Sequence, residues 1–173
     1  VKTNSNNTDG RVQVAVTPRF IPSCTDEALH SLGALASENS TYIQTHCSEG
    51  DWEHNYVIDR CGKSDTEALL SYGLLNRSTI LAHANFISEN DMDVIKEHGA
   101  GIAHCPLSNF FFSDAVFPLR RALEKGLRIG LGTDISGGPS SSIIDASRNA
   151  IIAARALENG VNPNIERTNR GLP

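Results

Sequence analysis

Short apolar runs alternate with longer segments of helical spacing along most of the chain. The β-branched and apolar runs are predicted strands, at residues 12–16, 41–46, 79–83, 100–105 and 127–134. The segments with apolar residues three or four positions apart are predicted helices, at residues 25–39, 50–60, 64–75, 88–99, 115–126 and 142–160. Strands that are apolar almost throughout are typical of a sheet buried on both faces, so this order predicts a parallel α/β fold.

Several predicted helices carry the residues that usually begin or end a helix. Thr25 and Ser88 stand at predicted starts, where a hydroxyl oxygen can accept an amide hydrogen bond. Gly99 and Gly126 stand at predicted ends, where the backbone often turns left-handed. The serines at 140–142 are expected to cap the last helix. These boundaries agree with those that the apolar spacing predicts.

Each predicted strand leads to a polar side chain at its carboxyl end. In chain order these side chains are Arg19, just past the first strand, and then His46, His83, His104 and Asp134. In parallel α/β folds, ligands bind at this edge of the sheet. Random surface polarity would not place a polar residue there five times, so we predict the functional site at this edge.

The number of βα units limits the choice of architecture. A closed (β/α)8 barrel takes about 250 residues, and five units do not close one. An open doubly wound sheet could be complete with five strands, but it usually has a glycine-rich loop after the first strand, and TPRFIPSC (17–24) contains no glycine. We therefore expect either an unusual open sheet or part of a larger barrel, with a disordered or linking segment at 1–11, a barrel fragment at 12–160 and an irregular tail at 161–173.

Composition and charge limit the classes of partner that are expected. The net charge is −5 and no run is rich in Lys or Arg, so no nucleic-acid partner is expected. No apolar run approaches the roughly 20 residues of a membrane helix, so no membrane partner is expected either. The N-terminal VKTNSNNTDG is too polar for a signal peptide, and the four cysteines lack CxxC spacing. These features predict reduced thiols, a cytoplasmic location and a small-molecule substrate.

His46, His83 and Asp134 form the strongest chemical set. Two imidazoles and a carboxylate commonly bind a divalent metal such as zinc, and catalytic zinc usually keeps an open position for water. The side chains are far apart in sequence, but each ends a buried strand, and strand ends converge at the mouth of a barrel, so the three can meet there. The other histidines that do not end a strand are expected to be ordinary surface or core residues; they are His30, His54 and His98.

Three further residues have both a chemical and a structural interpretation. Glu49 can exchange protons with a bound water and a substrate, or it can be an acid that complements a helix N-terminus or caps it near Ser48. Arg19 and Phe20 can bind a carbonyl and a flat ring, or they can be a surface ion-pair partner and a core aromatic. From these residues alone both interpretations remain open.

Two loops at the same edge are also candidates. HCPLSN (104–109) either shapes its loop and the hydrogen bonds around it or contacts a substrate directly. In TDISGG (133–138), Gly137 and Gly138 allow a tight backbone turn close to Asp134.

The motifs VTPRF, QTHCSE, LAHANFIS, GAGIAHCPLSN and IGLGTDISGG resemble, in order and approximate spacing, the C-terminal two-thirds of the catalytic barrel of the guanine deaminase family, within the metal-dependent amidohydrolase superfamily. HCPxSN and GTD are shared by many amidohydrolases, whereas TPRF followed by THxSE is more specific. The resemblance runs from about residue 12 to 157. It implies a partial (β/α)8 TIM barrel of the amidohydrolase type, covering barrel strands 4 to 8.

The resemblance also implies an activity, which is the hydrolysis of guanine to xanthine and ammonia with one zinc ion per full-length subunit. His46 resembles a zinc ligand, and Asp134 resembles the last zinc ligand and also handles a proton. His83 resembles the histidine that lies by the metal and orients the attacking water. A purine substrate and a homodimeric full-length protein are implied in the same way.

The remaining site residues are also assigned by the resemblance. Glu49 is similar to the glutamate that shuttles protons. Arg19 and Phe20 resemble the pair that grips guanine by hydrogen bonding and ring packing. His46 and Glu49 are expected to border the substrate as well.

The chain departs from the family pattern in what it lacks. It contains no H-x-H motif, which supplies two zinc ligands in the family, and it lacks the first barrel strands and the small β-sandwich. We therefore expect a fragment that is poorly stable and inactive alone. Two alternatives stay open: an amidohydrolase acting on another heterocycle, such as a pterin, a triazine or an oxidised purine, and a non-catalytic truncated product.

Overall fold

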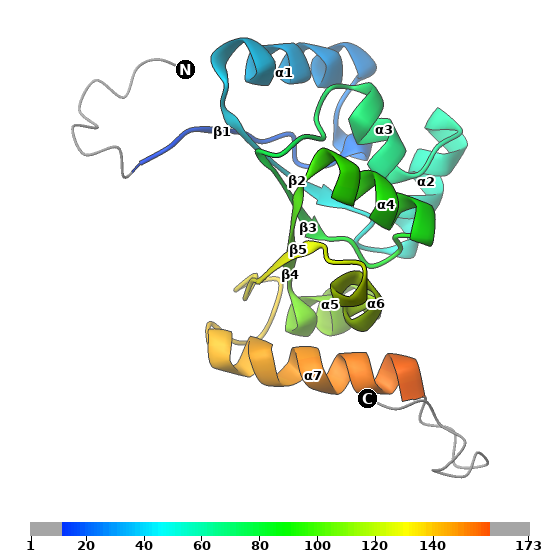
Figure 1. Cartoon of the computed structure of the whole chain (residues 1–173), viewed down its shortest axis with the longest axis vertical. Coiled ribbons are helices and arrows are strands. Elements are labelled where there is room, and N and C mark those ends of the chain that lie inside the picture. Colours follow the sequence, from blue (N-terminus) through cyan, green and yellow to red (C-terminus); the bar gives the residue numbers. More distant parts are fainter. Residues whose placement is uncertain (1–11, 160–173) are drawn as a thin grey trace.

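A computed structural model describes residues 12–159 and contains a sheet of five parallel strands (Figure 1). The strands pair in sequence order, so each new strand adds beside the one before it. Their bounds are β1 Ala15–Val16, β2 Tyr42–Cys47, β3 Thr79–His83, β4 Gly101–His104 and β5 Arg128–Leu131. All five predicted strands are therefore present, and the predicted parallel α/β class is confirmed.

Helices connect consecutive strands, as parallel pairing requires. Their bounds are η1 Ile21–Ser23, α1 Asp26–Asn39, α2 Asp51–Cys61, α3 Asp65–Ser71, α4 Glu89–His98, α5 Pro106–Ser113, α6 Leu119–Glu124 and α7 Ile143–Asn159. Figure 1 shows α2, α3 and α4 together on one side of the sheet, with α7 at the far end of the molecule. Among the residues described, no helix combines the length and the apolar character that crossing a membrane requires.

The cap residues act as the sequence predicts. Thr25 and Ser88 accept hydrogen bonds from the amides of Ala28 and Asp91, and Ser142 accepts one from the amide of Asp145. Gly99 and Gly126 have φ angles of 68° and 77°, in the left-handed region that favours glycine. These caps fix where the helices begin and end, and with them the loops at the carboxyl edge.

The structure differs from the predicted elements in three places. HCPLSN continues into a helix that was not predicted, because Pro106 starts α5, where a residue without an amide hydrogen is well tolerated. The short helix η1 was not predicted. Strand β5 ends at Leu131, so Asp134 lies in the loop beyond the strand and not at its last position.

The expectation that the sheet is buried on both faces was also wrong for the residues described. Leu81 and Ile102 are neighbours across β3 and β4, and both are buried against the helices. On the opposite face, Tyr42 and Ile80 are 51% and 46% exposed. The helices therefore cover one face, and apolar residues line the other, which is why these strands read as continuously apolar. The segments predicted at 1–11 and 161–173 lie outside the described residues.

Candidate functional site

Two of the predicted histidines meet at the carboxyl edge of the sheet. His46 near the end of β2 stacks on His83 at the end of β3, with ring centroids 5.3 Å apart and an interplanar angle of 20°. Glu49, on the loop after β2, places Oε1 3.6 Å from Nε2 of His83. His83 is buried, at 1% exposure, and Glu49 is largely shielded. The structure therefore joins three residues that the sequence predicted as site residues.

His83 reaches this position through an unusual backbone conformation. Thr79 and Leu81 point toward the helices, and strict alternation along β3 would send His83 the same way. Instead His83 has a φ angle of 70° and Ala84 one of 55°, and the ring stacks on His46. Such left-handed residues are costly and cluster at functional sites. In loops after the strands of this edge, the non-glycine residues with positive φ are Ser48, Ala84, Asp134 and Ser136.

Both rings are oriented by a hydrogen bond on the same nitrogen. Nδ1 of His46 lies 2.8 Å from the carbonyl oxygen of Arg19, and Nδ1 of His83 lies 2.9 Å from Oδ1 of Asn109. An oxygen of this kind only accepts, so each Nδ1 carries the proton and donates it. Each Nε2 is left with its lone pair free. Metal-binding histidines are held in this way by a partner on the other nitrogen.

The donor set fits a metal ion. His46, Glu49 and His83 each offer a ligand atom, and these atoms lie within 4.8 Å of one another. Two imidazoles with free Nε2 atoms and a carboxylate oxygen match the donors that zinc prefers. The carboxyl end of β2 and β3 can therefore hold a divalent ion.

Asp134 lies apart from this group but borders the same cavity. Its Oδ2 accepts a hydrogen bond from the hydroxyl of Ser108, at the start of α5. Its carbonyl oxygen accepts hydrogen bonds from the amides of Gly137 and Gly138, at 3.0 and 2.7 Å. A Cβ at Gly137 would lie 2.5 Å from Oδ2 of Asp134, so only glycine leaves room for the carboxylate. The predicted glycine turn is thus present, and the role of Asp134 as a metal ligand stays a prediction.

His104, which also ends a strand, is placed differently. Its ring packs on Phe117 with centroids 4.9 Å apart, and its Nδ1 faces the amide nitrogen of Asn109 at 3.5 Å. Nε2 is buried and has no hydrogen-bond partner among the described residues. Burial, with a smaller contribution from nearby His83, lowers the pKa of His104 to about 4. His104 is therefore a neutral buried residue behind the site.

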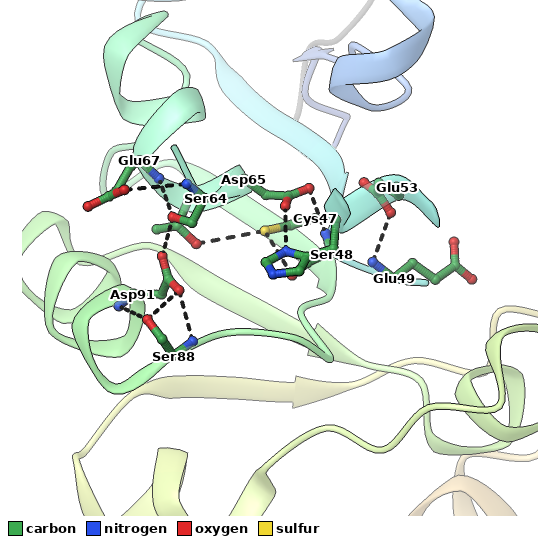
Figure 2. Close-up of polar contacts among 11 residues, drawn as sticks. Cys47, Ser48, Glu49, Glu53, Ser64, Asp65, Glu67, Ser88 and Asp91 are labelled. Carbon is green, nitrogen blue, oxygen red and sulfur yellow. Dashed lines mark hydrogen bonds and ion pairs between the residues drawn. The ribbon is translucent and has the colours of Figure 1, made fainter. Parts of the chain in front are cut away.

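The loop that carries Glu49 is held by buried acids (Figure 2). The amide of Ser48 donates to Oδ1 of Asp65 at 3.1 Å, and the amide of Glu49 donates to Oε2 of Glu53 at 2.8 Å. Nδ2 of Asn85 donates to the carbonyl oxygen of Glu49 at 2.8 Å. Burial raises the pKa of the Glu53 carboxyl to about 8 and raises the pKa of Asp65 above its usual value.

The position of Glu49 distinguishes between its two interpretations. Helix α2 begins at Asp51 with Gly50 as its N-cap, so Glu49 precedes the helix. Glu53, not Glu49, returns its carboxyl to the backbone at this helix start. The Glu49 carboxyl lies near His83 instead, and its role in proton transfer stays a prediction.

A cavity of about 600 Å³ opens above these residues. Arg19, Phe20, His46, Glu49 and Asp134 all line it, so five of the six predicted site residues share one cavity. His83 adjoins it through its contacts with His46 and Glu49. The volume lies within the range of about 300–1,000 Å³ that small-molecule sites occupy.

The cavity wall includes aromatic residues that the sequence did not single out. Trp52 lies 6.3 Å from Phe20 and 5.5 Å from Tyr56 between ring centroids, and Phe112 of α5 also lines the cavity. The guanidinium carbon of Arg19 lies 5.2 Å from the ring centroid of Phe20. Flat faces and an arginine suit a planar heterocycle with polar edges.

Asp65, Glu53 and Asn85 were also missed by the sequence interpretation. The spacing of Glu49 and Glu53, one helical turn apart, was a usable signal for Glu53. No local pattern points to Asp65, whose contact with Ser48 depends on how α3 packs. HCPLSN orients the site, because its Ser108 and Asn109 bind Asp134 and His83.

Comparison with known proteins identifies the family to which a chain with this site belongs. The sequence profile of the amidohydrolase family matches residues 2–168. The chain belongs to the amidohydrolase family. With this membership the five parallel strands are part of a TIM-type barrel, as the motifs predicted.

Among its amidohydrolase relatives, guanine deaminase of Dictyostelium discoideum is 42% identical over 142 residues, which are 81% of this chain and 32% of that protein. A 5-methylthioadenosine/S-adenosylhomocysteine deaminase of Archaeoglobus fulgidus is 34% identical over 146 residues, 84% of this chain and 35% of that protein. The crystal structure of guanine deaminase from C. acetobutylicum with bound guanine matches with a TM-score of 0.75 and 32% identity, over 79% of this chain and 33% of that one. The chain thus spans about a third of the relatives it matches.

Proposed function

We propose that the protein containing this chain hydrolyses guanine to xanthine and ammonia in a zinc-dependent reaction. The observation that carries the proposal is the group of His46, Glu49 and His83, whose ligand atoms lie within 4.8 Å of one another beside a small-molecule cavity. The similarity to guanine deaminases supports the choice of substrate.

The residues proposed to hold the zinc ion are His46, His83 and Asp134. A zinc ion held there would supply an acidified water, since bound zinc lowers the pKa of water to about 7. The free Nε2 atoms of His46 and His83 are the donors that such an ion needs. Asp134 is proposed to complete the set and to accept the proton that the attacking water loses.

Glu49 is proposed as the proton shuttle. Its Oε1 holds a proton and gives it to a purine ring nitrogen while water adds to the amine-bearing carbon. In the alternative in which His83 lies beside the ion without ligating it, its Nε2 accepts a hydrogen bond from the new hydroxyl group. When the carbon–nitrogen bond breaks, the amine takes up the proton that Asp134 accepted and leaves as ammonia. The hydroxyl group returns a proton to Glu49, and the ring retains the oxygen as a carbonyl.

Arg19 and Phe20 are proposed to bind the substrate. The arginine side chain donates hydrogen bonds to a carbonyl oxygen of guanine, and the phenylalanine ring packs against the purine plane. His46 and Glu49 border the same position from the sheet edge. Their placement around one cavity supports a flat, polar-edged substrate.

The proposal is tested with the full-length product of the gene. Guanine is added, and xanthine and ammonia are measured together with the zinc content of the protein. Glu49→Gln is the matched variant, because it keeps the side-chain shape but cannot carry the proton. We expect it to lower kcat by about 10²- to 10⁴-fold. A zinc-loaded wild type that releases no ammonia from guanine contradicts the proposal.

A second candidate is deamination of another heterocycle by the same site. The Archaeoglobus relative, named for substituted adenosines, favours this alternative. A panel of guanine, adenosine derivatives, a pterin and a triazine separates the two, because the preferred compound has the highest kcat/KM. A protein that binds no metal and converts none of these is the non-catalytic product.

The proposal includes two properties of the whole protein. We infer a homodimer and a cytoplasmic location from the resemblance to the guanine deaminase family. Analytical ultracentrifugation and cell fractionation test them, and a monomer or a secreted protein contradicts them.

A further inference from the structure

Two buried carboxyl groups lie directly behind the loop that carries Glu49. Asp65 is 2% exposed and Glu53 is 5% exposed, and each accepts a backbone amide of that loop. We infer that Glu53 and Asp65 are positioning residues, which fix the place of the Glu49 carboxyl by holding the amides of Ser48 and Glu49. The inference rests on the proposed function, since it concerns the same reaction.

The two hydrogen bonds act on consecutive peptide groups. Ser48 has a φ angle of 41°, so the backbone turns sharply between the strand that carries His46 and the start of α2. At this turn the amide of Ser48 meets Asp65 and the amide of Glu49 meets Glu53 (Figure 2). A non-glycine residue holds this conformation only when its surroundings fix it. The two carboxyls are the groups that do so from the helix side.

The acceptors are themselves anchored. Oδ2 of Asp65 lies 3.0 Å from Nδ1 of His54, and Asp65 begins α3 directly after its N-cap, Ser64. The hydroxyl of Ser64 in turn donates to Asp91 of α4, as Figure 2 shows. Glu53 sits in the first turn of α2. The loop is thus tied to α2 directly and through Asp65 to α3 and α4.

Stability alone gives no reason for this arrangement. Two carboxyls in one buried region cost desolvation free energy, and Oε1 of Glu53 has no hydrogen-bond partner among the described residues. What the arrangement provides is the placement of Oε1 of Glu49, 3.6 Å from Nε2 of His83. A displacement of about 1 Å at a reacting group can cost about 10²-fold in rate. Holding the backbone of Glu49 therefore serves proton transfer.

The experiment compares four variants of the full-length protein with guanine as substrate. Glu53→Ala and Asp65→Ala remove the acceptor oxygens. We expect each to lower kcat by about 10- to 100-fold, as for groups that orient a ligand, with KM and zinc content within about twofold of the wild type. Glu53→Gln and Asp65→Asn keep an acceptor oxygen and are expected to retain at least about a third of the wild-type kcat.

Glu67→Ala is the matched control. Glu67 accepts the amide of Ser64 in the first turn of α3, a bond of the same kind that does not touch the Glu49 loop. Its kcat is expected to equal that of the wild type, even if the protein melts at a lower temperature. If Glu53→Ala does not fold, Glu53→Asp replaces it, because the shorter side chain keeps a carboxyl group but cannot reach the amide of Glu49.

Several outcomes overturn the inference. Alanine variants that melt earlier but keep the wild-type kcat show that the two acids only stabilise the fold. Amide variants no better than alanine show that accepting the backbone amides is not what matters. A wild type inactive on guanine contradicts the proposed function, not this inference, and the same variants are then compared on whichever heterocycle the wild type converts.

Discussion

The ends of β2 and β3 differ from the end of β4, although all three carry a histidine near the carboxyl edge. His46 and His83 each donate from Nδ1 to an oxygen and keep Nε2 free beside Glu49. His104 receives a hydrogen bond on Nδ1, and its Nε2 is buried with no partner in the described part of the chain. Strand-end position alone therefore does not make a histidine a ligand; the group on its other nitrogen decides which atom is free.

The largest effects are expected at the end of β2 and β3. His46→Ala or His83→Ala removes a donor to the proposed zinc ion, which provides several kcal/mol of transition-state stabilisation, so kcat/KM should fall by at least about 10³-fold. Zinc content should fall in parallel, as mass spectrometry of the purified protein will show. His104→Gln is the matched change on β4 and should keep bound zinc. Loss of zinc in His104→Gln would show that His104 also supports zinc binding, so the proposed difference between β4 and the other two strands would be wrong.

Asn109 tests the link between the two regions. Asn109→Ala removes the oxygen that fixes the His83 ring, and loss of such a partner typically costs about 10- to 100-fold in metal affinity or activity. Titration of the zinc-free protein with zinc measures the affinity. An unchanged affinity would show that the ring is held by packing against His46 instead.

His104 gives a stability effect of intermediate size. Its pKa of about 4 in the fold lies below the usual value of 6.5, so the unfolded chain gains a proton first as the pH falls. Its contribution to folding is therefore intact above pH 6.5 and is lost on acidification toward pH 4. Between pH 7 and pH 5 this loss is about 2 kcal/mol.

Denaturant unfolding of the full-length protein at both pH values measures this loss, and His104→Gln should reduce the decline. An equal decline in wild type and variant would mean that His104 is not held neutral. In that case His104 on β4 would resemble His83 on β3 more closely than their hydrogen bonds indicate.

The smallest effect is expected on the cavity wall. Trp52 follows β2 and is held beside Phe20 and Tyr56, whereas Phe112 follows β4 on α5. Stacking of a base on an aromatic side chain contributes about 1–3 kcal/mol, and Trp52 is 65% exposed. A loss at the low end of this range, about 1 kcal/mol, should raise KM about fivefold in Trp52→Ala with little change in kcat. Steady-state kinetics with Phe112→Ala as the matched change tests the comparison, and a larger effect at Phe112 would reverse it.

Much of the fold could be predicted from the sequence because its signals are local. The alternation of apolar runs with helical spacing gave the parallel order, and Thr25, Ser88 and Gly99 marked helix ends through bonds to their own neighbours. Helix α5 was missed although Pro106 stands at its first position, where proline is favoured, because the eight residues PLSNFFFS are too short to show a helical apolar period. The strand-end rule brought His46 and His83 together correctly.

The rest of the site depends on tertiary packing. The left-handed turn at His83 reverses the direction expected from strand alternation, and no residue near it, such as a glycine, announces it. Asp65 contacts Ser48 only because α3 packs beside α2. His104 looks the same as His83 in sequence, since both end apolar strands. The backbone conformation of His83 and the orientation of the Asn109 amide separate the two residues in the fold.

One amide group therefore governs the proton placement of two imidazoles. Oδ1 of Asn109 faces His83 and Nδ2 faces His104, so rotating the amide by half a turn would exchange acceptor and donor for both rings at once. If only one ring changed its tautomer, two donors or two acceptors would face each other at that ring. The Asn109 amide therefore has two orientations, and each of them fixes one tautomer for both histidines. An aspartate of the same shape lacks the amide donor, and a leucine lacks both donor and acceptor, so neither residue can fix the two tautomers.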